Sequence, residues 1–366
     1  MKNKDGMYYV PAQKKAAKVC AAGDFIFSAA GLDHGHIYGM VSGLINAGAT
    51  LKYVYDPDPA KVAAFLKTFP TAVPASREAQ VLDDKEAQLV ASACVTSERC
   101  ALGLKVMDSG KHYFADKAPL TTLEQLESAQ KKVIATDKKY AVYYSERLHV
   151  ESAVLAGMMI KDGVIGQVLQ VIGLGPHRLN APTRPAWFFE KEKYGGILCD
   201  IGSHQIEQYL YFAGEEDAQV VRSQIANYKN PAHPGLDDFG DAMLVGQNGT
   251  TNYFRVDWFT PDALRTWGDG RTMILGTDGY IEIRKYADIG TDGGADTVLL
   301  VNHETEKKMS AAGTVGFPFF GELILDCLNH TERAMTQAHA FKAAELCIKA
   351  QLQAVRIGPE IRDGGL

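Results

Sequence analysis

The sequence predicts an α/β protein of two domains. The first is built on a parallel sheet, and the second is an α+β domain with a large, mostly antiparallel open sheet. Short apolar runs alternate with long helical stretches up to about residue 149, which is typical of βαβ units. The second half contains Asn-Gly and Asp-Gly, the dipeptides that tight hairpin turns favour. A chain of 366 residues, 46% of them hydrophobic, is long enough for two cores. We assign residues 1–22 to an N-terminal arm, 23–149 to the first domain and 150–366 to the second.

The arm is polar and lacks clear periodicity, so it either lies over the domain or a neighbouring subunit or is disordered. A strand is expected at residues 25–30. Strands and helices then alternate through the first domain, in runs at residues 38–47, 51–55, 59–69, 87–94, 97–109, 112–115, 122–135 and 140–144.

The turn after the first strand has the features of a dinucleotide site. Gly31 lets the backbone turn sharply into a helix, whose free N–H groups and positive dipole end can face a diphosphate. About 25 residues later Asp56 ends the second apolar run, where an acid can bind the adenine ribose. No arginine follows in residues 57–59 to neutralise a 2′-phosphate, which favours NAD over NADP. The sequence thus predicts a Rossmann domain whose phosphate loop is Gly31, Leu32, Asp33, His34, Gly35 and His36, although Asp33 and His36 stand where the usual motif has glycine.

The second half predicts an antiparallel sheet. After a helix at 150–161 and a strand at 168–174, two hairpins are expected around Asn248-Gly249 and Asp278-Gly279. Aromatic residues along these strands either pack on helices or leave one face of the sheet for another subunit. We expect a homo-oligomer formed through this sheet. A structural helix over residues 338–355 closes the chain.

Composition narrows the range of ligands. The net charge of −6, with no basic run interleaved with aromatics, argues against nucleic-acid and membrane partners. Six cysteines are scattered with no C-x-x-C pair, so we expect no metal site and no disulfide framework. No signal peptide or membrane-length apolar run is visible. We therefore expect a cytoplasmic protein that acts on small molecules.

Two segments carry candidate chemistry. Lys117 follows the strand at 112–115, at the sheet edge where open α/β folds place ligands; the alternative is an ordinary surface lysine. Asp200 and His204 are one helical turn apart, so together they can hold a diol and take up its proton. The alternative is that Asp200 caps the helix and His204 is a satisfied interior histidine.

The combination resembles the Gfo/Idh/MocA oxidoreductase family, which includes glucose-fructose oxidoreductase and inositol dehydrogenase. The family's E-K-P turn is similar to Asp116-Lys117-Ala118-Pro119, and its G-G-G-x-x-x-D-x-x-x-H segment is similar to residues 195–204. Residues 161–168 and 276–279 also look like family segments, and the resemblance covers nearly the whole chain from Phe25. Asp116 replaces glutamate, Ala118 separates Lys117 from Pro119, and the family's threonine-proline turn is altered at residues 95–99.

This resemblance implies that Lys117, Asp200 and His204 form the catalytic group, with His204 as general base, Lys117 at the reacting oxygen and Asp200 on a neighbouring hydroxyl. The implied cofactor residues are the phosphate loop, Asp56, Thr96, Asp116 and Lys117. Expected substrate residues, besides Asp200 and His204, are Tyr144, Arg147, His177, Arg178 and Trp187.

The function expected from this resemblance is NAD-dependent oxidation of a secondary ring hydroxyl of a sugar, glycoside or polyol, including carbon 3 of a glycoside. The alternatives are redox glycoside cleavage with recycled cofactor and a non-catalytic sugar- or NAD-binding regulator.

Overall fold

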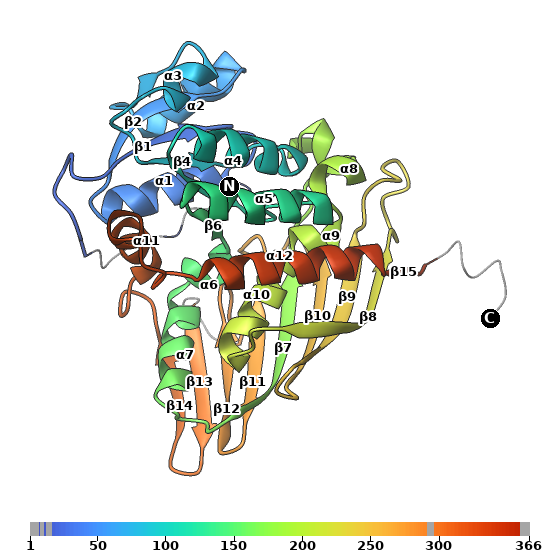
Figure 1. The fold of residues 1–366 in the computed structure, drawn as a ribbon. Coiled ribbons are helices and arrows are strands. Elements are labelled where there is room, and N and C mark those ends of the chain that lie inside the picture. The colour runs from blue at the N-terminus through green and yellow to red at the C-terminus, as the bar shows by residue number, and fades with distance from the viewer. Residues whose placement is uncertain (1–6, 8–10, 12–16, 291–295, 359–366) are drawn as a thin grey trace. The chain divides into compact units, whose positions relative to one another are not determined.

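The computed structural model describes residues 7, 11, 17–290 and 296–358, which form two compact units (Figure 1). The first unit consists of Met7–Tyr143 and Phe317–Phe341, and the second of Tyr144–Gly316 and the chain from Lys342. The second unit thus begins at Tyr144 rather than at residue 150, and the chain later returns to the first. Most of the expected N-terminal arm lies outside the described residues.

The first unit is the predicted parallel-sheet domain. Its six strands lie in the order β3-β2-β1-β4-β5-β6 and all neighbours pair in parallel. This order reverses direction between β1 and β4, the point at which doubly wound sheets bind ligands. The strands are β1 (Ile26–Ala30), β2 (Thr50–Tyr55), β3 (Val73–Pro74), β4 (Leu89–Ser92), β5 (His112–Asp116) and β6 (Tyr140–Tyr143).

Helices follow most of these strands, as the alternating pattern predicted. The elements are α1 (His36–Asn46), α2 (Pro59–Thr68), α3 (Glu78–Leu82), the 3-10 turn η1 (Thr96–Glu98), α4 (Arg99–Asp108) and α5 (Leu123–Thr136). Strands β4 and β5 are buried along their whole length, which explains why they are near-continuous apolar runs.

Helix α11 (Pro318–Asn329) joins the first unit although its sequence position suggested the second. The ring of Phe320 packs so closely on α1 that a Cβ atom at Gly43 would lie 2.3 Å from it. Phe319 and Phe320 also pack against Phe114 of β5. Burial of these aromatic rings holds the segment in place, because each contributes roughly 1.5–3 kcal/mol.

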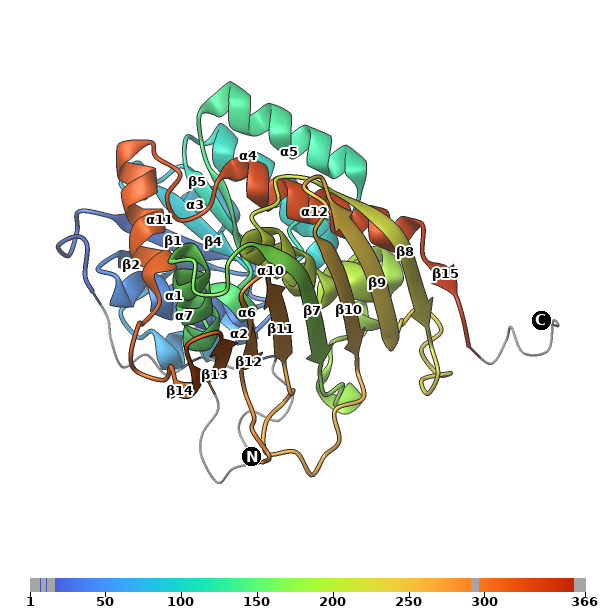
Figure 2. The same ribbon diagram turned by 90° about the horizontal axis from the view of Figure 1, so that it is seen from below.

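The second unit contains a nine-stranded sheet in the order β14-β13-β12-β11-β7-β10-β9-β8-β15 (Figure 2). Neighbours are antiparallel except for the pairs β7/β10 and β8/β15, so the predicted sheet type is confirmed. The strands are β7 (Val168–Pro176), β8 (Ala218–Ala226), β9 (Phe239–Gly246), β10 (Thr251–Asp257), β11 (Arg271–Gly276), β12 (Gly279–Arg284), β13 (Thr297–Asn302), β14 (Glu306–Ser310) and β15 (Val355–Arg356).

Both predicted hairpins are present, as β9/β10 and β11/β12. Helices α7 and α10 pack against the strands of this sheet. The helical elements are α6 (Ser145–Leu148), α7 (Glu151–Lys161), η2 (Ala181–Thr183), η3 (Ala186–Phe189), α8 (Lys191–Tyr194), α9 (Ile197–Asp200), α10 (Gly202–Ala213) and α12 (Gln337–Leu352).

Helix α12 starts in the first unit and ends in the second. It stops short of the predicted residue 355, because Val355 and Arg356 pair with β8 as β15. Within the described ranges, no helix has the length and apolarity needed to cross a bilayer.

Candidate active site

The turn after β1 is shaped around Gly31. This residue has φ +75°, and a Cβ atom there would lie 2.5 Å from Cβ of Cys94, so only glycine fits. The next residue, Leu32, donates its N–H to Oδ2 of Asp56 at 2.7 Å. The other oxygen of Asp56 accepts the N–H of Asp58 at 2.9 Å. Asp56 therefore connects the phosphate-loop turn to the segment after β2. The sequence analysis predicted a contact of Asp56 with a ribose but not this structural role.

Lys61 is a neighbour of this turn that the sequence analysis missed. Its Nζ atom lies 2.5 Å from Oδ1 of Asp33 and 3.6 Å from Oδ1 of Asp56. The sequence analysis considered only residues 57–59, whereas Lys61 comes from the first turn of α2. The carboxylates of Asp33 and Asp56 both interact with the ammonium group of Lys61, so this side chain is held at the turn.

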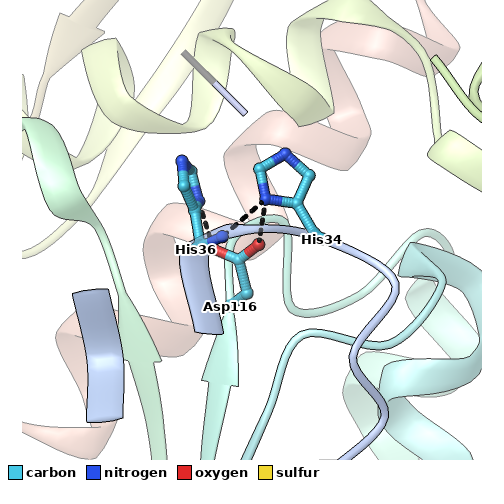
Figure 3. A group of neighbouring side chains, drawn as sticks. All are labelled: His34, His36 and Asp116. Atoms are coloured by element: carbon cyan, nitrogen blue, oxygen red, sulfur yellow. Dashed lines mark hydrogen bonds and ion pairs between the residues drawn. The ribbon is translucent and has the colours of Figure 1, made fainter. Parts of the chain in front are cut away.

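Asp116, the last residue of β5, is fully buried and accepts hydrogen bonds from several sides. Its Oδ1 atom lies 2.8 Å from Nδ1 of His36 (Figure 3). The same oxygen accepts the N–H of Lys117 at 2.8 Å, and Oδ2 accepts from Arg99 at 3.1 Å. Burial alone would raise the pKa of Asp116, but the charges of His36, Arg99 and His34 outweigh it and hold that pKa well below its usual range. Asp116 is therefore ionised at neutral pH.

Arg99, at the start of α4, is the main functional residue that sequence reasoning missed. It is 1% exposed and donates from Nε to the carbonyl of Cys94 at 2.9 Å. One terminal nitrogen donates to the carbonyls of Lys117 and Ala118, and the other to Asp116. Arg99 thus fixes the backbone around Lys117. Lys117 itself is 5% exposed, which rules out the surface-lysine alternative.

The Asp-x-x-x-His segment lies in the second unit. Asp200 ends α9 and His204 lies in the first turn of α10, and Ile201 between the two helices keeps helical angles. The two residues are thus about one helical turn apart, as predicted. The residue that precedes α10 is Ile201, so Asp200 does not cap that helix. His204 is 2% exposed.

Glycines set the start of this segment. Gly195 and Gly196 both have φ +89°, and a Cβ atom at Gly196 would lie 2.2 Å from the side chain of Gln351. Gln351 of α12 accepts the N–H of Leu198 at 2.9 Å and so holds the first turn of α9. The lack of a side chain at Gly196 therefore leaves room for Gln351, which holds the first turn of α9.

A buried ionic group accompanies His204. Glu146 is 1% exposed, and its Oε2 atom accepts from Lys285 at 2.8 Å and from Gln205 at 3.1 Å. Burial would raise the pKa of Glu146, but its interactions with the ammonium group of Lys285, and then with the imidazoles of His204 and His177, outweigh this and keep that pKa well below its usual range. Sequence analysis missed Lys285, because nothing local marks it as a partner of a residue far back in the chain.

The predicted substrate residues occupy varied positions. Arg147 forms an ion pair with Glu207 and stacks on Tyr211 with its guanidinium 3.9 Å from the ring centroid. Arg178 donates to the carbonyls of Pro261 at 2.6 Å and Leu264 at 2.8 Å. Both arginines thus support the fold. Tyr144 is fully buried, Trp187 is half-buried, and His177 packs on Trp258 and Trp267.

The predicted cofactor residues all belong to the first unit, including Thr96, which is buried in η1. Lys117 also belongs to that unit, whereas Asp200 and His204 belong to the second.

Comparison with known proteins gives consistent matches. A model of the GFO/IDH/MocA C-terminal domain matches residues 155–282. The crystal structure of a candidate oxidoreductase from Erwinia carotovora atroseptica SCRI1043 is 51% identical, with TM-score 0.89, and the match covers 91% of this chain and all of that one. Levoglucosan dehydrogenase in complex with NADH is 17% identical with TM-score 0.72, over 90% of this chain and 98% of that one, and shows the shared fold.

A curated relative, D-xylose dehydrogenase of Paenarthrobacter nicotinovorans, is 28% identical over 130 residues. This match spans 34% of the present chain and 33% of the relative.

Proposed function

Because the chain belongs to the Gfo/Idh/MocA oxidoreductase family, we propose that it oxidises a secondary ring hydroxyl of a sugar, glycoside or polyol to a ketone, with NAD as hydride acceptor. The observation that carries this proposal is the buried, fixed Lys117, together with Asp200 and His204 on consecutive helical turns. Relatives named as levoglucosan and D-xylose dehydrogenases support a sugar as the substrate.

The residues around the β1 turn fit a dinucleotide. Gly31 leaves free a space that a Cβ atom would fill, in the turn that leads into α1. The free N–H groups at the N-terminus of this helix favour a diphosphate. Asp56 stands at the end of β2, where an acid favours a ribose over a 2′-phosphate. Related structures named as NADH and NAD⁺ complexes support NAD as the cofactor.

The reaction assigns one task to each polar residue. Bound NAD supplies the acceptor for the hydride. The imidazole of His204 takes the hydroxyl proton, and the ammonium group of Lys117 stabilises the negative charge that develops on that oxygen. Asp200 accepts a hydrogen bond from a neighbouring hydroxyl and so orients the ring. The carboxylate of Glu146, whose charge interacts with His204, stabilises the imidazolium once the proton has moved.

The proposal is tested by absorbance at 340 nm while purified protein and NAD meet a panel of sugars, inositols and aryl glycosides, with products identified by mass spectrometry. Rising absorbance and a product two mass units lighter are expected, with NADP a poorer acceptor than NAD. A flat trace with an oxidised or cleaved product would instead indicate a retained, recycled cofactor. Unchanged substrates throughout the panel would favour a ligand sensor.

We also propose that copies of the chain associate through the outer face of the nine-stranded sheet. Strand register aligns Met273, Ile172, Tyr253 and Met243 in one row across β11, β7, β10 and β9. Met273 and Met243 are 47% and 49% exposed. A flat apolar row of this kind, on strands whose other face packs on helices, fits a second copy of the same surface.

Met273→Glu is expected to convert the wild-type oligomer into smaller species, because it places a charge in the centre of an apolar contact. Size-exclusion chromatography with light scattering measures the mass. Met158→Glu on α7 is the matched control, since Met158 is 51% exposed but lies off this face. A monomeric wild type, or a Met273→Glu variant of unchanged mass, would contradict the interface.

A further inference from the structure

An ion pair joins the phosphate-loop turn to the start of α2. Asp33 lies in the turn between β1 and α1, and Lys61 lies in the first turn of α2. The Nζ atom of Lys61 lies 2.5 Å from Oδ1 of Asp33 and 3.6 Å from Oδ1 of Asp56. The side chain of Lys61 is 35% exposed, whereas that of Asp56 is fully buried. The ammonium group is therefore open to solvent and lies beside the buried carboxylate that follows β2.

The backbone on both sides of this pair is fixed. The N–H groups that flank Asp33 are hydrogen-bonded, that of Leu32 to the carboxylate that follows β2 at 2.7 Å and that of His34 to a carbonyl of the segment after β4 at 2.8 Å. The side chain of Asp58 caps α2 by accepting an N–H of its first turn at 2.8 Å. A change in the ion pair can therefore move the side chains of Asp33 and Lys61 without moving the turn.

Carboxylates outnumber cations around this ammonium group. Desolvation lowers the pKa of Lys61, but the hydrogen bond and charge of Asp33, followed by the charges of Asp56 and Asp58, outweigh it and raise that pKa above its ordinary value. Lys61 is therefore charged at neutral pH. Because Asp33 already pairs with this charge, a further anion gains little from it.

We propose that the ion pair of Asp33 and Lys61 determines the preference of the site for NAD over NADP. NADP carries an additional phosphate on the adenine ribose, and a phosphate monoester has almost two negative charges at neutral pH. The acid that ends the second strand marks the ribose position in this fold, and Lys61 lies beside that acid, Asp56. Asp33 holds the ammonium group in the ion pair and so keeps it from binding the phosphate.

This inference rests on the proposed NAD site and adds a selectivity role for a residue of the phosphate loop. Asp33 stands where the usual motif has glycine. Glycine at this position would leave Lys61 without its partner at 2.5 Å. The departure from the motif thus has a function in the choice of nucleotide.

The test measures the binding of NADH and NADPH by isothermal titration calorimetry without substrate. Wild-type protein is expected to bind NADH more tightly than NADPH. Asp33→Asn removes one negative charge and frees the ammonium group of Lys61, so we expect the ratio of the NADPH to the NADH dissociation constant to fall by about tenfold or more. Circular dichroism checks that each variant is folded.

Asp84→Asn is the matched control, because Asp84 also pairs with a lysine of the first unit, Lys52, at 2.6 Å. Lys52 lies in the first half of β2, whereas ligands bind beyond the carboxyl ends of such strands. We expect this control to leave the ratio within about twofold of the wild type, since charges remote from the phosphate are screened.

A double-mutant cycle separates the release of Lys61 from a general effect of charge. Asp33→Asn is expected to change the ratio at least about threefold less in a Lys61→Met background, because no ammonium group is left to bind the phosphate. Lys61→Gln replaces Lys61→Met if the latter does not fold. An equal change in both backgrounds would overturn the role of the ion pair, and so would a wild type that prefers NADPH.

The same titrations distinguish failure of this inference from failure of the proposed function. If the wild type binds NADH but Asp33→Asn leaves the ratio where Asp84→Asn does, the inference alone is wrong and NAD stands as the cofactor. If the wild type binds neither nucleotide, the proposed function is contradicted, and the inference that rests on it falls as well.

Discussion

His204→Ala is expected to lower kcat by about 10²–10⁴-fold, the usual contribution of a positioned general base. Without the imidazole, the hydroxyl proton has no acceptor at the position that the first turn of α10 provides. NAD binding is expected to persist, because the predicted cofactor residues all lie in the first unit. Steady-state kinetics with the substrate found in the panel, and tryptophan fluorescence titration with NADH, separate the two effects.

His303→Ala is the matched control for this variant, since His303 is an exposed histidine of the same unit. Lys117→Ala is expected to cause a loss of similar size through the missing ammonium group. If both His204→Ala and Lys117→Ala keep turnover within tenfold of the wild type, the proposed mechanism is wrong.

Arg99→Met is expected to lower the free energy of unfolding by about 3–5 kcal/mol, the range for breaking a buried ion pair. The change removes every donor of a side chain that is 1% exposed, and it leaves the carboxylate of Asp116 buried without its guanidinium partner. The carbonyls of Cys94 and Ala118 also lose their hydrogen bonds. Urea denaturation followed by circular dichroism measures the loss.

Arg77→Met provides the comparison, because Arg77 is exposed and precedes α3 in the same unit. It is expected to change stability by less than about 0.5 kcal/mol. Arg99→Lys adds a test of positioning, since a lysine keeps the charge but cannot reach all four acceptors. We expect it to fold and to lose activity through a displaced Lys117. A change below 1 kcal/mol in Arg99→Met would contradict the role assigned to Arg99.

The features that could be predicted from the sequence are those that depend on residues close together in the chain. Alternating strands and helices, the Asn-Gly and Asp-Gly hairpins and the one-turn spacing of Asp200 and His204 each depend on a few adjacent residues. Their confirmation reflects backbone preferences that neighbours in the chain are sufficient to set.

The features that escaped prediction depend on partners distant in the chain. Nothing in its local sequence distinguishes Arg99 from an ordinary helix residue, because its partner Asp116 is brought beside it only by the placement of β5. The pair of Glu146 and Lys285 is separated by 139 residues, and no periodicity links them. Helix α11 belongs to the first unit because Phe319 and Phe320 pack there. The amphipathic pattern of the helix does not show which of the two units its apolar face packs against.

The return of the chain to the first unit has a consequence for biosynthesis. When the ribosome has completed β6, the parallel sheet is fully synthesised, but α11 is still about 170 residues away. Until then α1 and Phe114 lack the aromatic cover that Phe319 and Phe320 provide. The first unit to be translated is therefore completed late, after the sheet of the second unit has emerged. A nascent chain arrested between these points exposes an apolar surface that invites chaperone binding.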